Sequence, residues 1–364
     1  MSDKTIHILM VGARRTGKSS VLASMIDSFK SIAQDTNFRL TADANTSAIL
    51  DNKLINLREV FDDHWGENAF TIDEQPTAGT DDYVFTVSYL DKKKEQAIAT
   101  LEFHDVPGEE LGSNETAGKM GKAGVLLVAV DTVHLMEEGG KFSSVFHKDK
   151  VLKNVVANAG FADDDESMEP KMVLFVPLKC EKYYAEGRMN EVAEQVKKEF
   201  QSLIEYLTKP NLRERITVAI TPILTMGSVA FDHFGVDEGG KVIRQQVCGN
   251  QADRRPAYVY YKFTGDKTFR PQYCEQPVLY ILSFVVNSAK KAEAEAKAKK
   301  KKHPLLGLAF DAVKYCFLWG LSPVIAIIWM LADSADFKDS YEKISVNLKK
   351  RGDGYTILQN PLSM

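Results

Sequence analysis

The sequence has 364 residues and is poor in several features that mark particular classes of protein. Its four cysteines are scattered and form no CxxC pair and no Cys/His cluster, which argues against a zinc site and against a disulfide scaffold. It also lacks an excess of either charge, because 46 basic and 50 acidic residues give a net charge of −4. Without a global positive charge, we expect no nucleic acid among its partners.

The first residues, MSDKTIHILMVG, lack the basic and then apolar layout of a secretory signal. We therefore expect a reducing, cytoplasmic setting. No internal repeat is visible, and 44% hydrophobic and 26% charged residues are ordinary values for a globular protein. This composition excludes a wholly disordered chain, a collagen-like fibre and a polytopic membrane protein.

What the sequence does have is an alternation of apolar runs and helical patterns. The alternation predicts an α/β fold of three layers, with helices on both faces of a mainly parallel sheet. A charged turn joins two of the predicted strands as a hairpin, which supplies one antiparallel edge strand. The predicted strands are 6–11, 84–90, 99–105, 124–131, 172–178 and 215–224, with 257–263 as an added edge strand, and the predicted helices are 44–63, 145–159 and 188–207.

The stretch GARRTGKS, residues 12–19, matches the phosphate-binding pattern GxxxxGK[ST] between a predicted strand and a predicted helix. Glycines let backbone N–H groups turn toward phosphate oxygens, and the helix start presents its positive end to the same anion. Lys18 is predicted to bridge the β- and γ-phosphates, and Ser19 to ligate Mg²⁺. The predicted fold is therefore a P-loop NTPase sandwich. Its predicted phosphate-binding residues are Gly12, Thr16, Gly17, Lys18, Ser19 and Ser20.

A second pattern, LEFHDVPGEEL, places Asp105 at the end of a predicted strand and Gly108 three residues later. A carboxylate in this position can hold Mg²⁺ through water, and the N–H of a flexible glycine can reach the γ-phosphate. Asp-x-Pro-Gly is also good chemistry for a plain turn at a strand end. Its position after a hairpin and beyond a P-loop favours the nucleotide-binding interpretation.

The order of P-loop, long segment, hairpin, DxxG, strand, helix and strand resembles the Ras-like GTPases of the TRAFAC class, over roughly residues 5–288. Where that class has the base-recognition motif NKxD, this sequence has Leu-Lys-Cys-Glu, so the asparagine is absent and the acid is a glutamate. The resemblance implies that Lys179 packs along the purine and that Glu181 accepts hydrogen bonds from guanine. It also implies a short base loop at 225–229, with Ser228 as a base-binding residue.

The stretch RTGKS resembles the P-loop of guanylate-binding proteins and atlastins, whose arginine acts as an internal arginine finger. Carried over, that finger is Arg15, which would stabilise charge on the transferring phosphoryl group. Glu109 stands where Ras-like proteins have a water-orienting glutamine, and its charge needs a nearby cation beside a γ-phosphate, for which Arg14 and Arg15 of the P-loop are the candidates. The resemblance therefore names Arg15, Gly108 and Glu109 as catalytic residues.

Ras-like proteins also have a switch threonine that ligates magnesium, and both Thr77 and Thr80 fit its place before the hairpin. More loosely, the whole chain resembles bacterial TRAFAC GTPases of the double-GTPase type. The resemblance adds a homodimer across the nucleotide face to the expected partners, beside an effector that the sequence does not name.

The chain changes character near residue 289, where a segment with seven lysines and two glutamates begins. Residues 315–332 then run for 18 residues without a charge. Such a segment can insert in a membrane whose anionic surface attracts the lysines, or it can pack as an apolar helical segment on the domain or on a partner. The expected organisation is a nucleotide-binding domain at 1–288 with insertions near 31–80 and 227–256, a lysine-rich helix or linker at 289–303, an apolar segment at 304–332 and a polar tail at 333–364.

Taken together, these patterns predict a protein that binds GTP with Mg²⁺ and slowly hydrolyses it to GDP, as a switch or mechanical GTPase, peripheral to the inner face of a membrane or anchored there. Two alternatives stay open. The glutamate at 109 and the incomplete NKxD favour a nucleotide-locked scaffold that recruits a partner. The third reading is an ATPase in which Glu181 has no part in base choice.

Overall fold

The computed structural model describes residues 5–62, 68–72, 82–92, 94–161, 170–245, 255–302, 324, 327–328, 331, 334–349 and 352–362. Both switch-threonine candidates, Thr77 and Thr80, lie outside these residues, as does most of the apolar segment at 304–332. Within the described residues, the main sheet has eight strands in the order β11-β8-β7-β6-β1-β5-β4-β2.

Five neighbouring strands of the main sheet are parallel, and each contains one of the apolar runs of the sequence. Successive residues of β1 alternate between two cores, so that Ile6 and Ile8 face one core while Leu9 and Val11 face the other. Because both faces are covered, β6, β7 and β8 are buried along their whole length. The parallel strands are β5 (Lys94–Pro107), β1 (Thr5–Gly12), β6 (Val125–Asp131), β7 (Lys171–Leu178) and β8 (Ile216–Ile220).

The sheet has three antiparallel pairings where the sequence predicted a single antiparallel edge strand. The hairpin partner of β5 is β4 (Asp82–Asp91), as predicted, but β2 (Phe38–Ala42) lies beyond it at the edge. At the opposite edge β11 (Thr356–Gln359) pairs with β8. Both extra strands are four or five residues long and lie in segments read as an insertion and a tail, so local periodicity is too short to reveal them.

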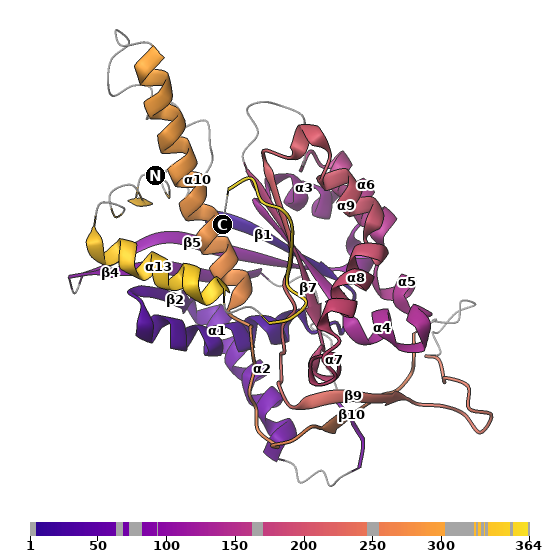
Figure 1. Cartoon of the computed structure of the whole chain (residues 1–364). Helices are drawn as coiled ribbons and strands as arrows, with labels where there is room; N and C mark the ends of the chain where they lie inside the picture. The colour runs from indigo at the N-terminus through magenta and orange to yellow at the C-terminus, as the bar shows by residue number, and fades with distance from the viewer. Residues whose placement is uncertain are drawn as a thin grey trace.

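Helices cover both faces of the sheet (Figure 1). On one face lie α1 (Lys18–Asp35), α2 (Ala44–Asp62), α10 (Gln276–Lys302) and α13 (Ala335–Lys349). On the other face lie α3 (Asn114–Lys122), α6 (Asp149–Asn158), α8 (Met189–Glu199) and α9 (Gln201–Leu207). The predicted helix at 44–63 is confirmed as α2. The predicted helix at 188–207 is instead two helices, because Phe200 leaves the helical conformation at φ −103° and ψ 28° to pack against Phe175.

Short helices connect the larger elements near the carboxyl ends of the parallel strands. The predicted helix at 145–159 is likewise divided, into a short α5 and α6. The short elements are α4 (Thr132–Met136), α5 (Ser143–Phe146) and α7 (Glu181–Ala185), with 3₁₀ turns η1 (Gly108–Glu110), η2 (Glu137–Gly140) and η3 (Pro210–Leu212).

A second sheet of three strands, in the order β3-β10-β9, lies beside the carboxyl ends of the main parallel strands (Figure 1). The segment 257–263 was predicted to add an edge strand to the main sheet, and this prediction is wrong, because β10 (Val259–Phe263) pairs with β9 (Val229–Phe234) and β3 (Phe70–Thr71). Aromatic side chains explain the placement: Phe70, for example, packs on Phe263 with ring centroids 5.0 Å apart.

The carboxyl-terminal segments belong to the same core as the sheet. Helix α10 runs through most of the lysine-rich segment 289–303, which is therefore a helix, and Lys290 Nζ lies 4.3 Å from the ring centroid of Tyr341 on α13. Of the segment 304–332, the described residues Val324, Ile327, Ile328 and Leu331 are helical, buried and part of the core under α1 and α10.

The spacing of those four residues, i, i+3, i+4 and i+7, is one face of a helix. These four described residues are therefore part of the same core as the sheet. Among the helices in the described ranges, none combines the length and the apolar character needed to cross a membrane. The segment read as a polar tail, 333–364, contributes α13 and β11 to the fold.

Candidate functional site

The loop between β1 and α1 turns sharply at two residues with positive φ. Arg15 has φ 65° and Gly17 has φ 102°, a conformation that glycine adopts without steric cost. A Cβ atom on Gly12 would approach the Cβ of Ala129 to 3.0 Å, so the start of the loop also requires glycine. The sequence pattern thus corresponds to a loop that wraps around the amino-terminal end of α1.

Lys18 occupies the centre of this loop. Its Nζ donates to the carbonyl oxygens of Gly12, at 2.8 Å, and Ala13, at 3.2 Å. It also lies 3.3 Å from Oδ1 of Asp105, and the lysine side chain is only 7% exposed. A buried ammonium held by carbonyls and one carboxylate is a fixed positive charge at the amino-terminal end of α1, where the helix dipole also favours an anion.

Asp105 reaches Lys18 because β5 lies beside β1, with Asp105 in register with Met10. The next turn follows at once: a Cβ atom on Gly108 would lie 3.4 Å from the backbone nitrogen of Ala13. Ser19, the second residue of α1, is partly buried in the same region. A hydroxyl and a carboxylate are oxygen donors of the kind that Mg²⁺ takes, so the residues present fit a magnesium ion.

Lys179, which directly follows β7, links the P-loop to the end of β6. Its Nζ donates to the carbonyl oxygen of Arg15 at 2.8 Å and pairs with Oδ2 of Asp131 at 3.2 Å. Asp131 ends β6 and is fully buried. Burial raises the pKa of this carboxyl, but the charges and hydrogen bonds of His134 and the charge of Lys179 outweigh burial and hold the pKa well below its usual range.

Glu181 lies at the start of α7, buried against the turn that follows β8. Its Oε1 accepts hydrogen bonds from the backbone N–H groups of Met226, at 3.0 Å, and Gly227, at 3.3 Å. Burial raises the pKa of Glu181, and the hydrogen bonds from Met226 and Gly227 together with the charge of Lys179 partly offset that effect. The base-reading candidates Lys179 and Glu181 are therefore brought together with the predicted loop at 225–229.

A cavity of about 600 Å³ lies between the P-loop and Glu181, although Lys18 and Asp105 are not among its lining residues. The P-loop residues Thr16, Gly17 and Ser20 line it on one side, and Lys179, Glu181 and Thr225 line it on another. Ser228, the residue predicted to bind the base, donates its hydroxyl to the carbonyl oxygen of Thr268, and Thr225 and Met226 form the cavity wall in its place. The remaining wall is largely apolar and comes from α2 and the second sheet, through Leu57, Val60, Phe70, Val229, Phe231 and Tyr261.

That apolar wall was missed by the sequence analysis. Leu57, Val60 and Phe70 lie in the predicted insertion 31–80, Val229 and Phe231 in the predicted insertion 227–256, and Tyr261 in the predicted edge strand 257–263. The pairing of β3, β9 and β10 brings the last four of these residues together. An apolar wall opposite charged groups is the usual composition of a small-molecule pocket.

A second cavity, of about 410 Å³, lies on the other side of Lys179 and carries positive charge. Arg14, Arg15 and Arg255 line it. Arg255 follows the loop after β9 and pairs with Glu109 at 3.8 Å. The sequence analysis assigned the cation near Glu109 to the P-loop, and Arg255 was missed because nothing in the local sequence links it to that loop.

No protein-family model matches this chain, and no curated protein matches it. Among solved structures it matches the GTPase-like domain of S. cerevisiae Ski7, bound to GTP, with a TM-score of 0.31 and 11% sequence identity. The match covers 61% of this chain and 43% of that chain. A likeness at this TM-score carries no argument, so the conclusions about function depend on the geometry of the chain itself.

Proposed function

We propose that this protein binds GTP together with Mg²⁺ and hydrolyses it slowly. The observation that carries the proposal is the cavity of about 600 Å³ that runs from the P-loop to the buried carboxylate of Glu181. A nucleoside triphosphate has the same two ends: a polyphosphate and a base.

The phosphate end is argued from Lys18. Its ammonium now lies among the loop carbonyls and Asp105, so a triphosphate would gain a desolvated cation and the backbone N–H groups of the loop at once. Ser19 and Asp105 would hold Mg²⁺. When bound, that ion neutralises charge on the phosphate oxygens.

The base end is argued from Glu181. A carboxylate has about four acceptor sites, and Oε1 uses some of them on two backbone N–H groups. The N1–H and 2-amino groups of guanine can satisfy the rest, whereas adenine presents an acceptor at N1 and would leave those remaining acceptor sites without donors. The apolar wall formed by Phe231 and Tyr261 suits the face of a purine ring.

The proposal also includes hydrolysis of the bound GTP. Arg15 and Arg255 both line the cationic cavity beside the P-loop, so either guanidinium can stabilise charge that develops on the transferring phosphoryl group. Glu109, paired with Arg255 and 44% exposed, is proposed to orient the attacking water. The anionic membrane surface and the homodimer across the nucleotide face stay predictions from the sequence.

Calorimetric titration of GTP, ATP and XTP tests this function. GTP should bind more tightly than ATP by at least about 100-fold, because an unpaired buried polar group costs several kcal/mol. Glu181→Gln keeps an acceptor for Met226 and should lower GTP affinity while raising affinity for XTP, whose 2-oxo group accepts from the new amide. Lys18→Ala should lower the affinity for every triphosphate.

Glu186→Gln and Lys30→Ala are matched controls, because both side chains lie on the surface and pair with neighbours of their own segment, Arg188 and Asp27. Equal affinity of the parent for ATP and GTP would overturn the base assignment and favour an ATPase. Tight GTP binding with no turnover would favour a nucleotide-bound scaffold.

A further inference from the structure

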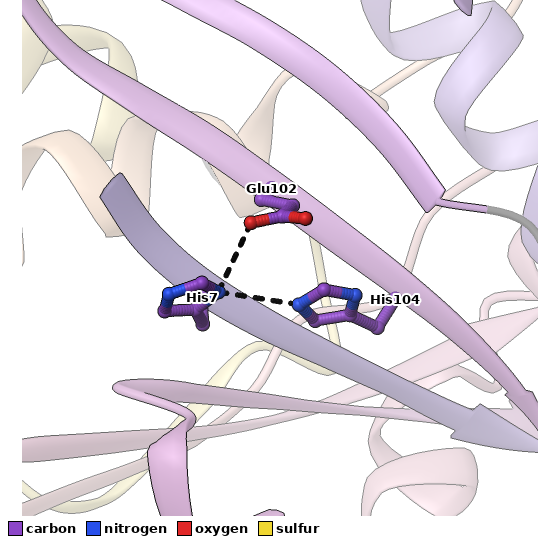
Figure 2. A group of neighbouring side chains, drawn as sticks. All are labelled: His7, Glu102 and His104. Carbon is purple, nitrogen blue, oxygen red and sulfur yellow. Dashed lines mark hydrogen bonds and ion pairs between the residues drawn. The ribbon is translucent and has the colours of Figure 1, made fainter. Parts of the chain in front are cut away.

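Three side chains that the nucleotide site does not use meet on the sheet face covered elsewhere by α3 and α6. His7 lies on β1, and Glu102 and His104 lie two residues apart on β5, so both β5 side chains point to the same face. His7 pairs in register with Glu102 on the neighbouring strand. Figure 2 shows the three side chains pointing toward one another across the two strands.

Their ligand atoms have the spacing of a metal site. His7 Nδ1 lies 3.1 Å from Oε2 of Glu102 and 3.2 Å from Nε2 of His104. A tetrahedral zinc ion with ligands at about 2.0–2.1 Å keeps those ligand atoms about 3.3 Å apart. The three ligand atoms all lie within 4.8 Å of one another, and the Glu102 side chain is 27% exposed.

A carboxylate holds one of the two imidazoles in the orientation that a metal ligand needs. Asp82, at the start of β4, lies with Oδ1 2.7 Å from Nδ1 of His104. A proton on Nδ1 donates to Asp82, which leaves the Nε2 lone pair directed at the cluster. Metal-binding histidines commonly have such a carboxylate on the other ring nitrogen, where it fixes the tautomer and increases the basicity of the ligand.

The donor set selects the ion. Two imidazole nitrogens and one carboxylate suit Zn²⁺ and its neighbours in the transition series, whereas Mg²⁺ and Ca²⁺ prefer oxygen donors alone. The His7 side chain is 30% exposed, so water can reach the cluster from the solvent side. Lys119 Nζ lies 3.7 Å from the same Asp82 oxygen, so Asp82 pairs with an ammonium as well as with the imidazole of His104.

We propose that His7, Glu102 and His104 form a binding site for one Zn²⁺ ion, with water in the fourth position. The proposed site differs from the expectation from the sequence, which argued against a zinc site because the chain has no CxxC pair and no Cys/His cluster. It lies on the two strands that end in the P-loop and in Asp105, but the proposal is independent of nucleotide binding.

The test uses the full-length protein without a polyhistidine tag, freed of metal by a chelator. Competition with a chromogenic zinc indicator should give one ion per chain with micromolar or tighter affinity. Co²⁺ should bind to the same site with the strong visible absorption of a four-coordinate ion. His7→Asn and Glu102→Gln should each weaken Zn²⁺ binding by at least about 100-fold, and Asp82→Asn by about 10- to 100-fold.

His233→Asn is the matched control, since His233 also pairs with a carboxylate, that of Asp232, but lies on β9 away from the cluster. GTP affinity, measured in parallel, checks that each variant is folded. Three results would overturn the proposal: no saturable binding by the parent, unchanged affinity in both His7→Asn and Glu102→Gln, or a weak six-coordinate Co²⁺ spectrum. If GTP also failed to bind to the parent, that would count against the proposed function and leave the zinc site standing.

Discussion

The strand pair β1 and β5 carries two charged clusters that differ in burial. At the carboxyl ends, Lys18 and Asp105 are paired and buried, with side chains 7% and 10% exposed. Nearer the middle of the strands, His7 and Glu102 form a cluster that is about three times as open, at 30% and 27%. Lys18 is the first residue of α1, whereas His7 and Glu102 lie on the strands themselves, so the two clusters differ in the elements that surround them.

The covered end makes its charges part of the fold. A buried charge must keep its partner, because a lone ion in the interior costs several kcal/mol. Lys18 with Asp105, and Lys179 with Asp131, satisfy this requirement before any ligand arrives. His7 and Glu102, the open cluster, have no such requirement, since water reaches both side chains, whereas the neighbouring His104 side chain is only 9% exposed.

The largest expected effect is on the rate of GTP hydrolysis and concerns Arg15 and Arg255, which line the cationic cavity beside the P-loop. Arg15→Ala should lower kcat for GTP by on the order of 10³-fold, about 4 kcal/mol, with little change in stability, because an exposed guanidinium acts on charge that develops only in the transition state. Single-turnover kinetics measure this. Arg213→Ala, at an exposed arginine that lines neither cavity, is the control, and a loss in Arg255→Ala in place of Arg15→Ala would assign the role to the segment before β10.

Removal of one buried partner should come next. Lys179→Met keeps the length of the side chain but leaves Asp131 without its ammonium, at a carboxylate that is fully buried. We expect the free energy of unfolding to fall by about 3 kcal/mol or more. Urea denaturation without nucleotide measures this, with Lys182→Met as the control on a more exposed pair. A loss below about 1 kcal/mol, the range of surface pairs, would contradict the contrast between the clusters.

The stability of the protein should depend on pH through His147, which is buried beside Asp131. Its Nε2 accepts from the backbone N–H of Asp131 at 2.9 Å, which requires an uncharged ring nitrogen. Burial lowers the pKa of His147 to about 4, from an ordinary value of 6.5, although the charge of Asp131 acts in the opposite direction. Between these values the unfolded chain binds the additional proton, so stability rises with pH.

The contribution of His147 should therefore be complete above about pH 6.5 and be lost as pH falls toward about 4, a change of up to about 3 kcal/mol. His147→Gln can keep both hydrogen bonds, to Asp131 and to Ser143, without titrating. Unfolding free energies measured across this pH range should depend less steeply on pH in His147→Gln than in the parent. Equal slopes would show that His147 does not titrate in this range.

The smallest effect is expected at the open cluster. In metal-free protein, His7→Asn should change the free energy of unfolding by less than about 0.5 kcal/mol, as exposed pairs usually do. Chemical denaturation in the presence of a chelator measures this. A loss as large as that of Lys179→Met would show that both clusters support the fold and would remove the distinction between them.

Much of the fold followed from local pattern. The six strands predicted for the main sheet are confirmed, as is the helix at 44–63, since each is long and strongly periodic. The division of the predicted helix at 188–207 was not foreseen, because it depends on the packing of Phe200 against a strand. The strands β2 and β11 and the second sheet also depend on partners far away in the sequence.

By itself, the sequence determined the features whose residues are contiguous. The residues of the loop that holds Lys18 are consecutive in the sequence, because a phosphate-binding loop is made of successive backbone N–H groups and the glycines that turn them. Tertiary structure alone decided which side chains gather from different strands: the apolar wall of the cavity, Arg255 beside Glu109, and His7 beside Glu102 and His104. Such groups arise from strand order and register, which long-range pairing sets and no short window of sequence contains.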